Sequence, residues 1–131
     1  MKKTLKRITA SILATATMAV GTVGICASAA GGWGTFTVNG VTVNKYIDVS
    51  KTAAGAISSC SASSCSYLYV SITAYHASTG SKFADDYVTR GSVSVSVTPD
   101  NGKIFSHGSS YHYAIINNVG GGSSMSASAG I

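Results

Sequence analysis

The chain has 131 residues and a formal net charge of +5, from nine lysines and arginines against four aspartates and no glutamate. Four of the nine basic residues lie within the first seven positions, so the rest of the chain is close to neutral, with its five cations standing singly. A nucleic-acid surface needs clustered cations that displace counterions from phosphates, and this distribution excludes nucleic acid as a partner.

The first thirty residues have the three parts of a secretory signal peptide. A basic start at 2–7 is followed by an apolar stretch at 8–25 and by small residues at 27–29. We expect cleavage after Ala29 or Ala30 and release of a secreted, extracellular protein. The form of the signal favours a bacterial source.

Two other interpretations of this segment are weaker. An uncleaved anchor is one, because 8–25 is close to spanning length, but threonines and a serine dilute it and no stable membrane span is expected after cleavage. A lipoprotein acylated at Cys26 is the other, and Ile25 stands where that modification needs a small residue.

After the signal, we expect a single β domain at 31–117 and a flexible Gly/Ser-rich tail at 118–131. Apolar and polar residues alternate with period two along several short segments, and no long helical period is present. The fold class predicted is all-β, a small antiparallel β-sandwich, with a partly open β-barrel as the alternative.

The first clear element is a hairpin at 35–43. Asn39 and Gly40 join two alternating runs and suit a type I′ turn, in which both central residues have positive φ. The register then pairs four sets of residues: Val38 with Val41, Thr37 with Thr42, Phe36 with Val43 and, further out, Trp33 with Tyr46.

Between Asp48 and Ser66 large side chains are rare, which predicts a loop ordered by a disulfide. Once the signal with Cys26 is removed, Cys60 and Cys65 are the remaining cysteines, and an exported protein favours a bond between them.

The segment 67–75 predicts a central strand with aliphatic side chains on one face. Its opposite face carries Tyr67, Tyr69 and Tyr75. A shorter strand of mixed character follows at 83–89, after a turn.

A strict Ser/Val alternation at 92–98 predicts a half-exposed strand, and 99–102 (Pro-Asp-Asn-Gly) a turn with glycine in the left-handed position. We expect 103–107 to pair back, with Ile104 opposite Val97, and a last strand at 111–117.

No catalytic or metal-binding set is evident. Asp85 and Asp86 are adjacent and point to opposite faces of a strand, so they do not converge. The three histidines, His76, His107 and His112, lack the spacing of a zinc motif. The sequence therefore predicts a protein that is not an enzyme and has no cofactor or metal.

Seven tyrosines and one tryptophan in a small β domain favour a binding surface. The candidate ligand-binding residues are Trp33, Tyr46, Tyr67, Tyr69 and Tyr75. The candidate partners are a cell-wall polymer, a glycan or another protein, at the cell envelope or in the medium. The alternative is that these rings simply pack against neighbouring strands.

The Gly31-Gly32-Trp33 start after the signal, together with a short chain rich in tyrosine, histidine and serine, resembles small secreted bacteriocins of the lactococcin type. This resemblance covers the signal junction and the composition. It implies a secreted antimicrobial protein as the alternative function.

Overall fold

The computed structural model describes residues 31–129, which form eight strands. The predicted signal peptide lies outside the described residues. The strands are β1 (Gly32–Val38), β2 (Val41–Val49), β3 (Ala54–Cys60), β4 (Cys65–His76), β5 (Ser81–Val88), β6 (Gly91–Val97), β7 (Phe105–Ile116) and β8 (Val119–Ser128).

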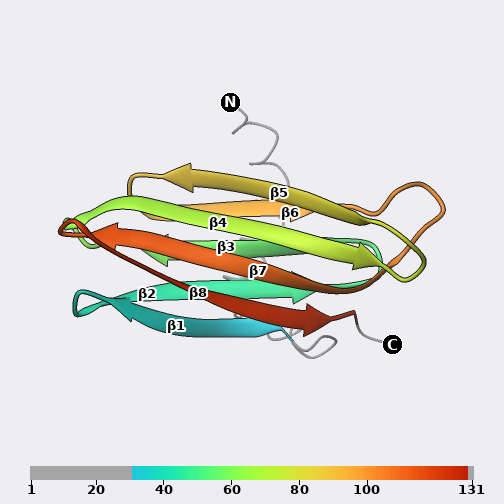
Figure 1. Cartoon of the computed structure of the whole chain (residues 1–131), viewed down its shortest axis with the longest axis horizontal. Coiled ribbons are helices and arrows are strands. Elements are labelled where there is room, and N and C mark those ends of the chain that lie inside the picture. The colour runs from blue at the N-terminus through green and yellow to red at the C-terminus, as the bar shows by residue number, and fades with distance from the viewer. Residues whose placement is uncertain (1–30, 130–131) are drawn as a thin grey trace.

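The strands form two four-stranded antiparallel sheets that pack face to face. Sheet A has the order β1-β2-β3-β6, and sheet B has the order β5-β4-β7-β8. In Figure 1 sheet B lies in front of sheet A, and the strands run along the long axis of the molecule. The sheets are not closed into a barrel, so the predicted sandwich is confirmed against the open-barrel alternative. Within residues 31–129 no helix has the length and apolar character that crossing a membrane requires.

The core lies between the sheets and comes from one face of each alternating strand. Leu68, Val70 and Ile72 of β4 are fully buried, as the alternation of the 67–75 segment predicts. Sheet A contributes Val43 and Ile47 of β2, also fully buried. Removal of these apolar surfaces from water is the main force that holds the two sheets together.

Two tight hairpin turns fix the register within the sheets. Asn39 and Gly40 have φ values of 48° and 80°, as a type I′ turn requires. Between β7 and β8, Asn117 and Asn118 have φ values of 51° and 63° and form a second such turn, which sequence analysis missed. The predicted pairs of the first hairpin are all present: Val38–Val41, Thr37–Thr42, Phe36–Val43 and Trp33–Tyr46.

The prediction of a loop between Asp48 and Ser66 is wrong for its central part, which is β3. This strand pairs with β2 on one side and β6 on the other, and nearly all of its residues are buried. Small side chains let the sheets approach closely here. Ser58 Oγ in sheet A donates a hydrogen bond to the Tyr69 carbonyl oxygen in sheet B, at 2.9 Å. Small residues in this segment therefore indicate a close sheet contact and not a loop.

The predicted Cys60–Cys65 disulfide is not formed. Both cysteines are buried free thiols that lie 4.2 Å apart. The turn between them is closed by a backbone hydrogen bond from Cys65 N to the Ala62 oxygen, at 3.0 Å. The Cys65 thiol also contacts the Thr89 carbonyl oxygen, at 3.3 Å. Backbone bonding and burial therefore hold this connection without a covalent link.

The prediction that 103–107 pairs with the preceding strand is also wrong. The turn at 99–102 forms, with Gly102 at a φ of 81° and Lys103 N bonded to the Asp100 oxygen. The chain then crosses to sheet B, where β7 pairs with β4 and β8. Val97 pairs with Ala54 of β3 instead of Ile104, because β3 occupies that place in sheet A.

The predicted flexible tail at 118–131 is wrong over most of its length, since Val119–Ser128 form β8 at the edge of sheet B. β8 pairs with β7 residue by residue over its whole length. Its glycines receive side chains from neighbouring strands. A Cβ on Gly121 would lie 3.0 Å from a methyl carbon of Val38, so Val38 of sheet A fills the space that a side chain would occupy. The burial that orders this strand is supplied by its neighbours.

Candidate functional site

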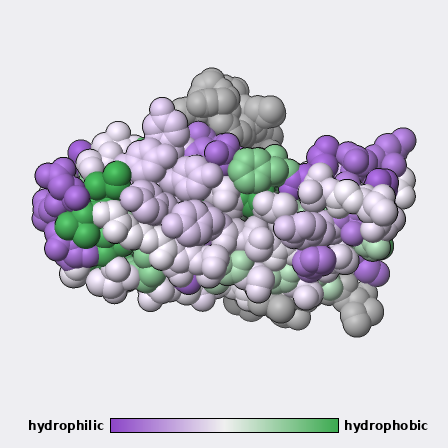
Figure 2. All heavy atoms as spheres, in the orientation of Figure 1, coloured by the Kyte–Doolittle hydropathy of each residue, from purple (hydrophilic) through white to green (hydrophobic). Residues whose placement is uncertain are grey.

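Six of the seven tyrosines lie on the outer face of sheet B, turned away from the core, and all of them except Tyr75 form one cluster. The register aligns Tyr69 of β4 with Tyr87 of β5 on one side and with Tyr113 of β7 on the other. Tyr67 and Tyr111 each lie two residues before another of these tyrosines, so all five side chains point to one face. Figure 2 shows this face, with pale aromatic side chains gathered on its left half and strongly hydrophilic ones mainly at the two ends.

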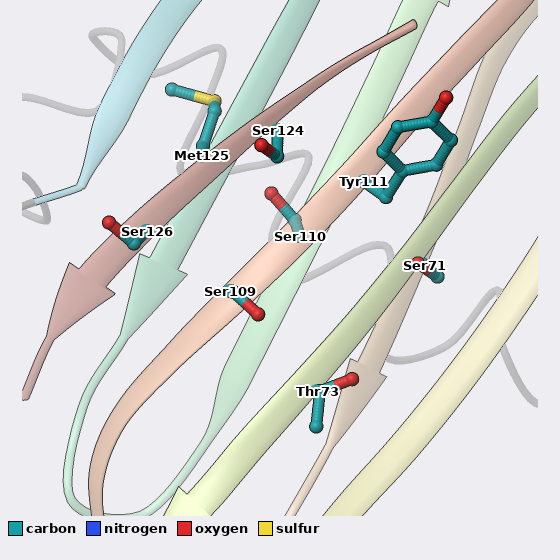
Figure 3. Close-up of a pocket in the computed structure, with 8 residues that line it drawn as sticks. All are labelled: Ser71, Thr73, Ser109, Ser110, Tyr111, Ser124, Met125 and Ser126. Carbon is teal, nitrogen blue, oxygen red and sulfur yellow. The ribbon is translucent and has the colours of Figure 1, made fainter.

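The rings of Tyr111 and Tyr113 lie across the neighbouring strand β8. A Cβ on Gly122 would collide with the hydroxyl end of Tyr111, whose Cζ would be 2.7 Å away. A Cβ on Gly120 would meet Tyr113 in the same way, with Cζ at 2.9 Å. The ring ends therefore rest over two glycines of β8, and of the two rings Tyr111 is exposed whereas Tyr113 is half-buried. Figure 3 shows the Tyr111 ring broadside.

The rings of Tyr67 and Tyr69 stand at a steep angle to this pair. They are within 9° of parallel to each other, whereas Tyr67 is inclined by 69° to Tyr113 and Tyr69 by 59° to Tyr111. Tyr87 stacks on Tyr67, with ring centroids 5.4 Å apart. We call this arrangement the tyrosine trough, with Tyr111 and Tyr113 as its floor and Tyr67 and Tyr69 as its wall.

A pocket of about 400 Å³ adjoins the floor at Tyr111. Its volume lies in the range of small-molecule sites. Strands β4, β7 and β8 each contribute to it, and hydroxyl groups predominate in its lining (Figure 3). The lining residues are Ser71, Thr73, Ser109, Ser110, Tyr111, Ser124, Met125 and Ser126.

The trough is uncharged, and its phenols remain hydrogen-bond donors. Burial raises the pKa of Tyr67 and Tyr69 above the usual tyrosine range, and the nearby Asp85 carboxylate adds to the effect. Tyr69 Oη donates to Asp85 Oδ2 at 3.1 Å. Lys45 of sheet A reaches the β8 edge of the pocket, where its ammonium donates to the Ser124 carbonyl oxygen at 3.3 Å.

The predicted ligand-binding residues fall into three places. Tyr67 and Tyr69 form the wall of the trough. Tyr75 lies further along the same face, where it stacks on His107 with ring centroids 4.7 Å apart. Trp33 and Tyr46 form the expected cross-strand pair in sheet A, with centroids 4.8 Å apart, and do not join the others. Trp33 is 41% exposed whereas Tyr46 is fully buried.

Sequence reasoning did not select Tyr87, Tyr111 and Tyr113 as site residues. Tyr111 and Tyr113 share one face of their predicted strand, which was a usable signal. The spaced glycines at 120 and 122 were the second signal, because glycine on alternate positions of a strand leaves room for a neighbour's aromatic ring. Only the pairing of β7 with β8 connects the two signals.

A serine and histidine pair lies inside the sandwich. His112 is fully buried, with Nδ1 2.8 Å from Ser58 Oγ and Nε2 2.7 Å from Ser110 Oγ. Because the Ser58 hydroxyl donates its hydrogen to the Tyr69 carbonyl, it accepts from His112 Nδ1–H, and Nε2 accepts from Ser110. Burial, with a smaller contribution from Lys45, lowers the pKa of His112 to about 4. The bond between His112 and Ser58 ties the two sheets together, and the hydroxyl of Ser110, which also lines the pocket, is engaged by His112.

The other histidines take separate structural roles. His76 is buried against Phe105, and its Nε2 accepts a hydrogen bond from Asp100 N at 3.2 Å. His107 lies on the outer face of sheet B, with its Nδ1 2.8 Å from Ser106 Oγ. Among residues 31–129, no three histidine, cysteine or acidic side chains are grouped so that they could hold a metal ion.

Comparison with known proteins gives no relative: no family model, no curated protein and no solved structure matches this chain.

Proposed function

We propose that this protein is a secreted, non-enzymatic binding domain and that the tyrosine trough, with its adjoining pocket, is the ligand-binding surface. The observation that carries the proposal is the placement of Tyr111 and Tyr113 over Gly122 and Gly120. In this position the hydroxyl ends of the rings lie over the backbone of β8, and the exposed Tyr111 ring, next to the half-buried Tyr113 ring, offers aromatic surface for a ligand to stack on.

The surroundings of the rings support the same function. Tyr111 is 43% exposed and Tyr87 is 60% exposed, although both are large aromatic side chains that β structure can bury. The adjoining pocket offers many hydroxyl groups as donors and acceptors. Aromatic surfaces beside hydroxyl groups combine stacking with hydrogen bonding, as binding surfaces rich in tyrosine and serine do.

Secretion is the other part of the proposal, and it rests on the basic, apolar and small-residue segments at 2–29. At the cell envelope or in the medium, a secreted binding domain would meet cell-wall polymers, glycans and other proteins. N-terminal sequencing of the protein recovered from culture medium tests this part, with Gly31 or Ala30 expected as the first residue.

A retention assay tests the binding function. Protein expressed from the full chain is incubated with bacterial cell-wall fractions, insoluble polysaccharides and whole cells, and the unbound protein is measured after centrifugation. We expect retention on at least one of these materials and loss of retention in the Tyr67→Ala/Tyr111→Ala double variant. The absence of retention on every material would contradict the proposal, as would equal retention of the double variant.

A further inference from the structure

The floor of the trough and the pocket lie in one line. Tyr113, Tyr111 and Ser109 succeed one another on the outer face of β7, and Ser109 lines the pocket. The ring centroids of Tyr111 and Tyr113 are 6.4 Å apart, with the planes within 25° of parallel. This distance is comparable with the length of one pyranose unit. A ligand that contacts both rings and the pocket is therefore extended, and a chain of sugars can place one unit on each ring.

The chemistry along this line changes from aromatic to hydroxylic. A pyranose ring carries C–H groups on its broad faces and hydroxyl groups around its rim. The C–H face suits the exposed side of a tyrosine ring, and the rim suits tyrosine and serine hydroxyls. The Tyr69 ring, inclined by 59° to Tyr111, stands beside the floor and would border a chain lying along β7.

The charge of the surface selects among polymers of this shape. None of the residues that form the trough and the pocket is charged. Asp85 borders the trough and accepts the Tyr69 hydrogen bond, while Lys45 is already bonded to Ser123 and Ser124 at the β8 edge. An anionic polymer needs a row of cations along its length, and this surface does not provide one.

From these three observations we infer that the ligand is an uncharged, linear polysaccharide lying along β7, with successive sugar rings stacked on Tyr113 and Tyr111 and the next sugar in the hydroxyl-lined pocket. This inference rests on the proposed binding function and names the ligand class of the same surface.

Affinity electrophoresis tests the inference with soluble polysaccharides in native gels. The uncharged probes are hydroxyethyl cellulose, laminarin and galactomannan, and the anionic probes are polygalacturonate and poly-γ-glutamate. The protein is produced from the full chain. Three variants address the floor: Tyr111→Ala and Tyr113→Ala remove a ring, and Gly120→Ala keeps Tyr113 but displaces its ring from β8. Phe83→Ala is the matched control, since Phe83 is an exposed aromatic residue of β5 that lies outside the trough and the pocket.

We expect retardation by at least one uncharged polysaccharide and by neither anionic one. Each floor variant should weaken binding roughly tenfold, the loss of one stacking contact, and Phe83→Ala should bind as the unmodified protein does. Thermal unfolding of each variant checks that the fold is retained, and the two ring deletions keep the test valid if Gly120→Ala does not fold.

Four results would overturn the inference. Retardation by the anionic polymers alone contradicts the ligand class, and so does cell-wall retention that depends on the trough without any retardation by the uncharged probes. In both cases the proposed binding function stands. An equal loss of binding in Phe83→Ala contradicts the location. If the protein binds no probe and no cell-wall fraction, the result contradicts both the ligand class and the proposed binding function.

Discussion

His112 links the stability of the sandwich to pH, and replacing it with asparagine makes the effect measurable. In the folded protein burial lowers the pKa of His112 to about 4, whereas an unfolded chain restores a value near 6.5. Between these values the unfolded state binds a proton that the folded state does not. The free energy of unfolding therefore falls as pH decreases from about 6.5 to about 4.

The size of the effect follows from the difference between the two pKa values. About 2.5 pKa units at about 1.4 kcal/mol each amount to about 3–4 kcal/mol of stability in full, of which about 3 kcal/mol is lost by pH 4. His112→Asn removes the titration but also removes ring contacts and a hydrogen bond to Ser58 or Ser110, which costs about 2–3 kcal/mol at pH 7. The variant should therefore be clearly less stable at pH 7 and close to the unmodified protein at pH 4.

Urea unfolding of both proteins at half-unit pH steps from 7.5 to 4 measures this difference. Asp48 changes the free energy of unfolding in the opposite direction over nearly the same pH interval. Comparing the variant with the unmodified protein therefore isolates the effect of His112. Burial raises the pKa of Asp48 to about 6, so its contribution to the free energy of unfolding decreases as pH rises. An NMR titration of the His112 ring gives its pKa directly. Two parallel stability curves, or a ring pKa above 6, would refute the reasoning.

Three further changes test other parts of the structure. Leu68→Ala removes a fully buried side chain of β4 and should lower the free energy of unfolding by about 3 kcal/mol in urea, and a loss below about 1 kcal/mol would show that this site is not tightly packed. Asn39→Ala places alanine at a φ of 48° and should cost about 1 kcal/mol, whereas Asn39→Gly should cost less; equal losses would contradict the turn assignment. Asp48→Asn should stabilise the fold at pH 7 by about 1 kcal/mol, a value already reduced because the carboxyl is half-exposed. The gain should vanish near pH 4, because a raised carboxyl pKa destabilises the fold only at a pH at which the folded group must ionise. Thermal unfolding at the two pH values checks it, and a gain that persists at pH 4 would point to another cause.

The first hairpin shows how far local sequence information extends. Asn39 and Gly40 are the residues that accept positive φ, and their position between two alternating runs sets the register of β1 against β2 without reference to the rest of the chain. The two faces of β4 were predictable for the same reason, since side chains alternate along any strand whatever it pairs with.

The tyrosine trough shows what local information leaves out. Tyr67 and Tyr69 were recognisable as one face of a strand, but their neighbours Tyr111 and Tyr113 lie more than forty residues away in the chain. The pairing of β4 with β7 brings the two pairs together. The position of the β7 rings depends further on Gly120 and Gly122 in β8, a strand that its own composition did not predict.

The sequence by itself determined the strands whose side chains alternate, the turns whose residues accept positive φ, and therefore the all-β class with one small sandwich. The tertiary structure decided which strands are neighbours, that the small residues of β3 lie between β2 and β6, and that the glycine-rich β8 is ordered. The physical reason is that β3 and β8 carry little apolar surface of their own. β3 is held between its neighbour β2 and the distant strand β6. β8 is hydrogen-bonded to β7 and covered by side chains such as Val38 of the distant strand β1.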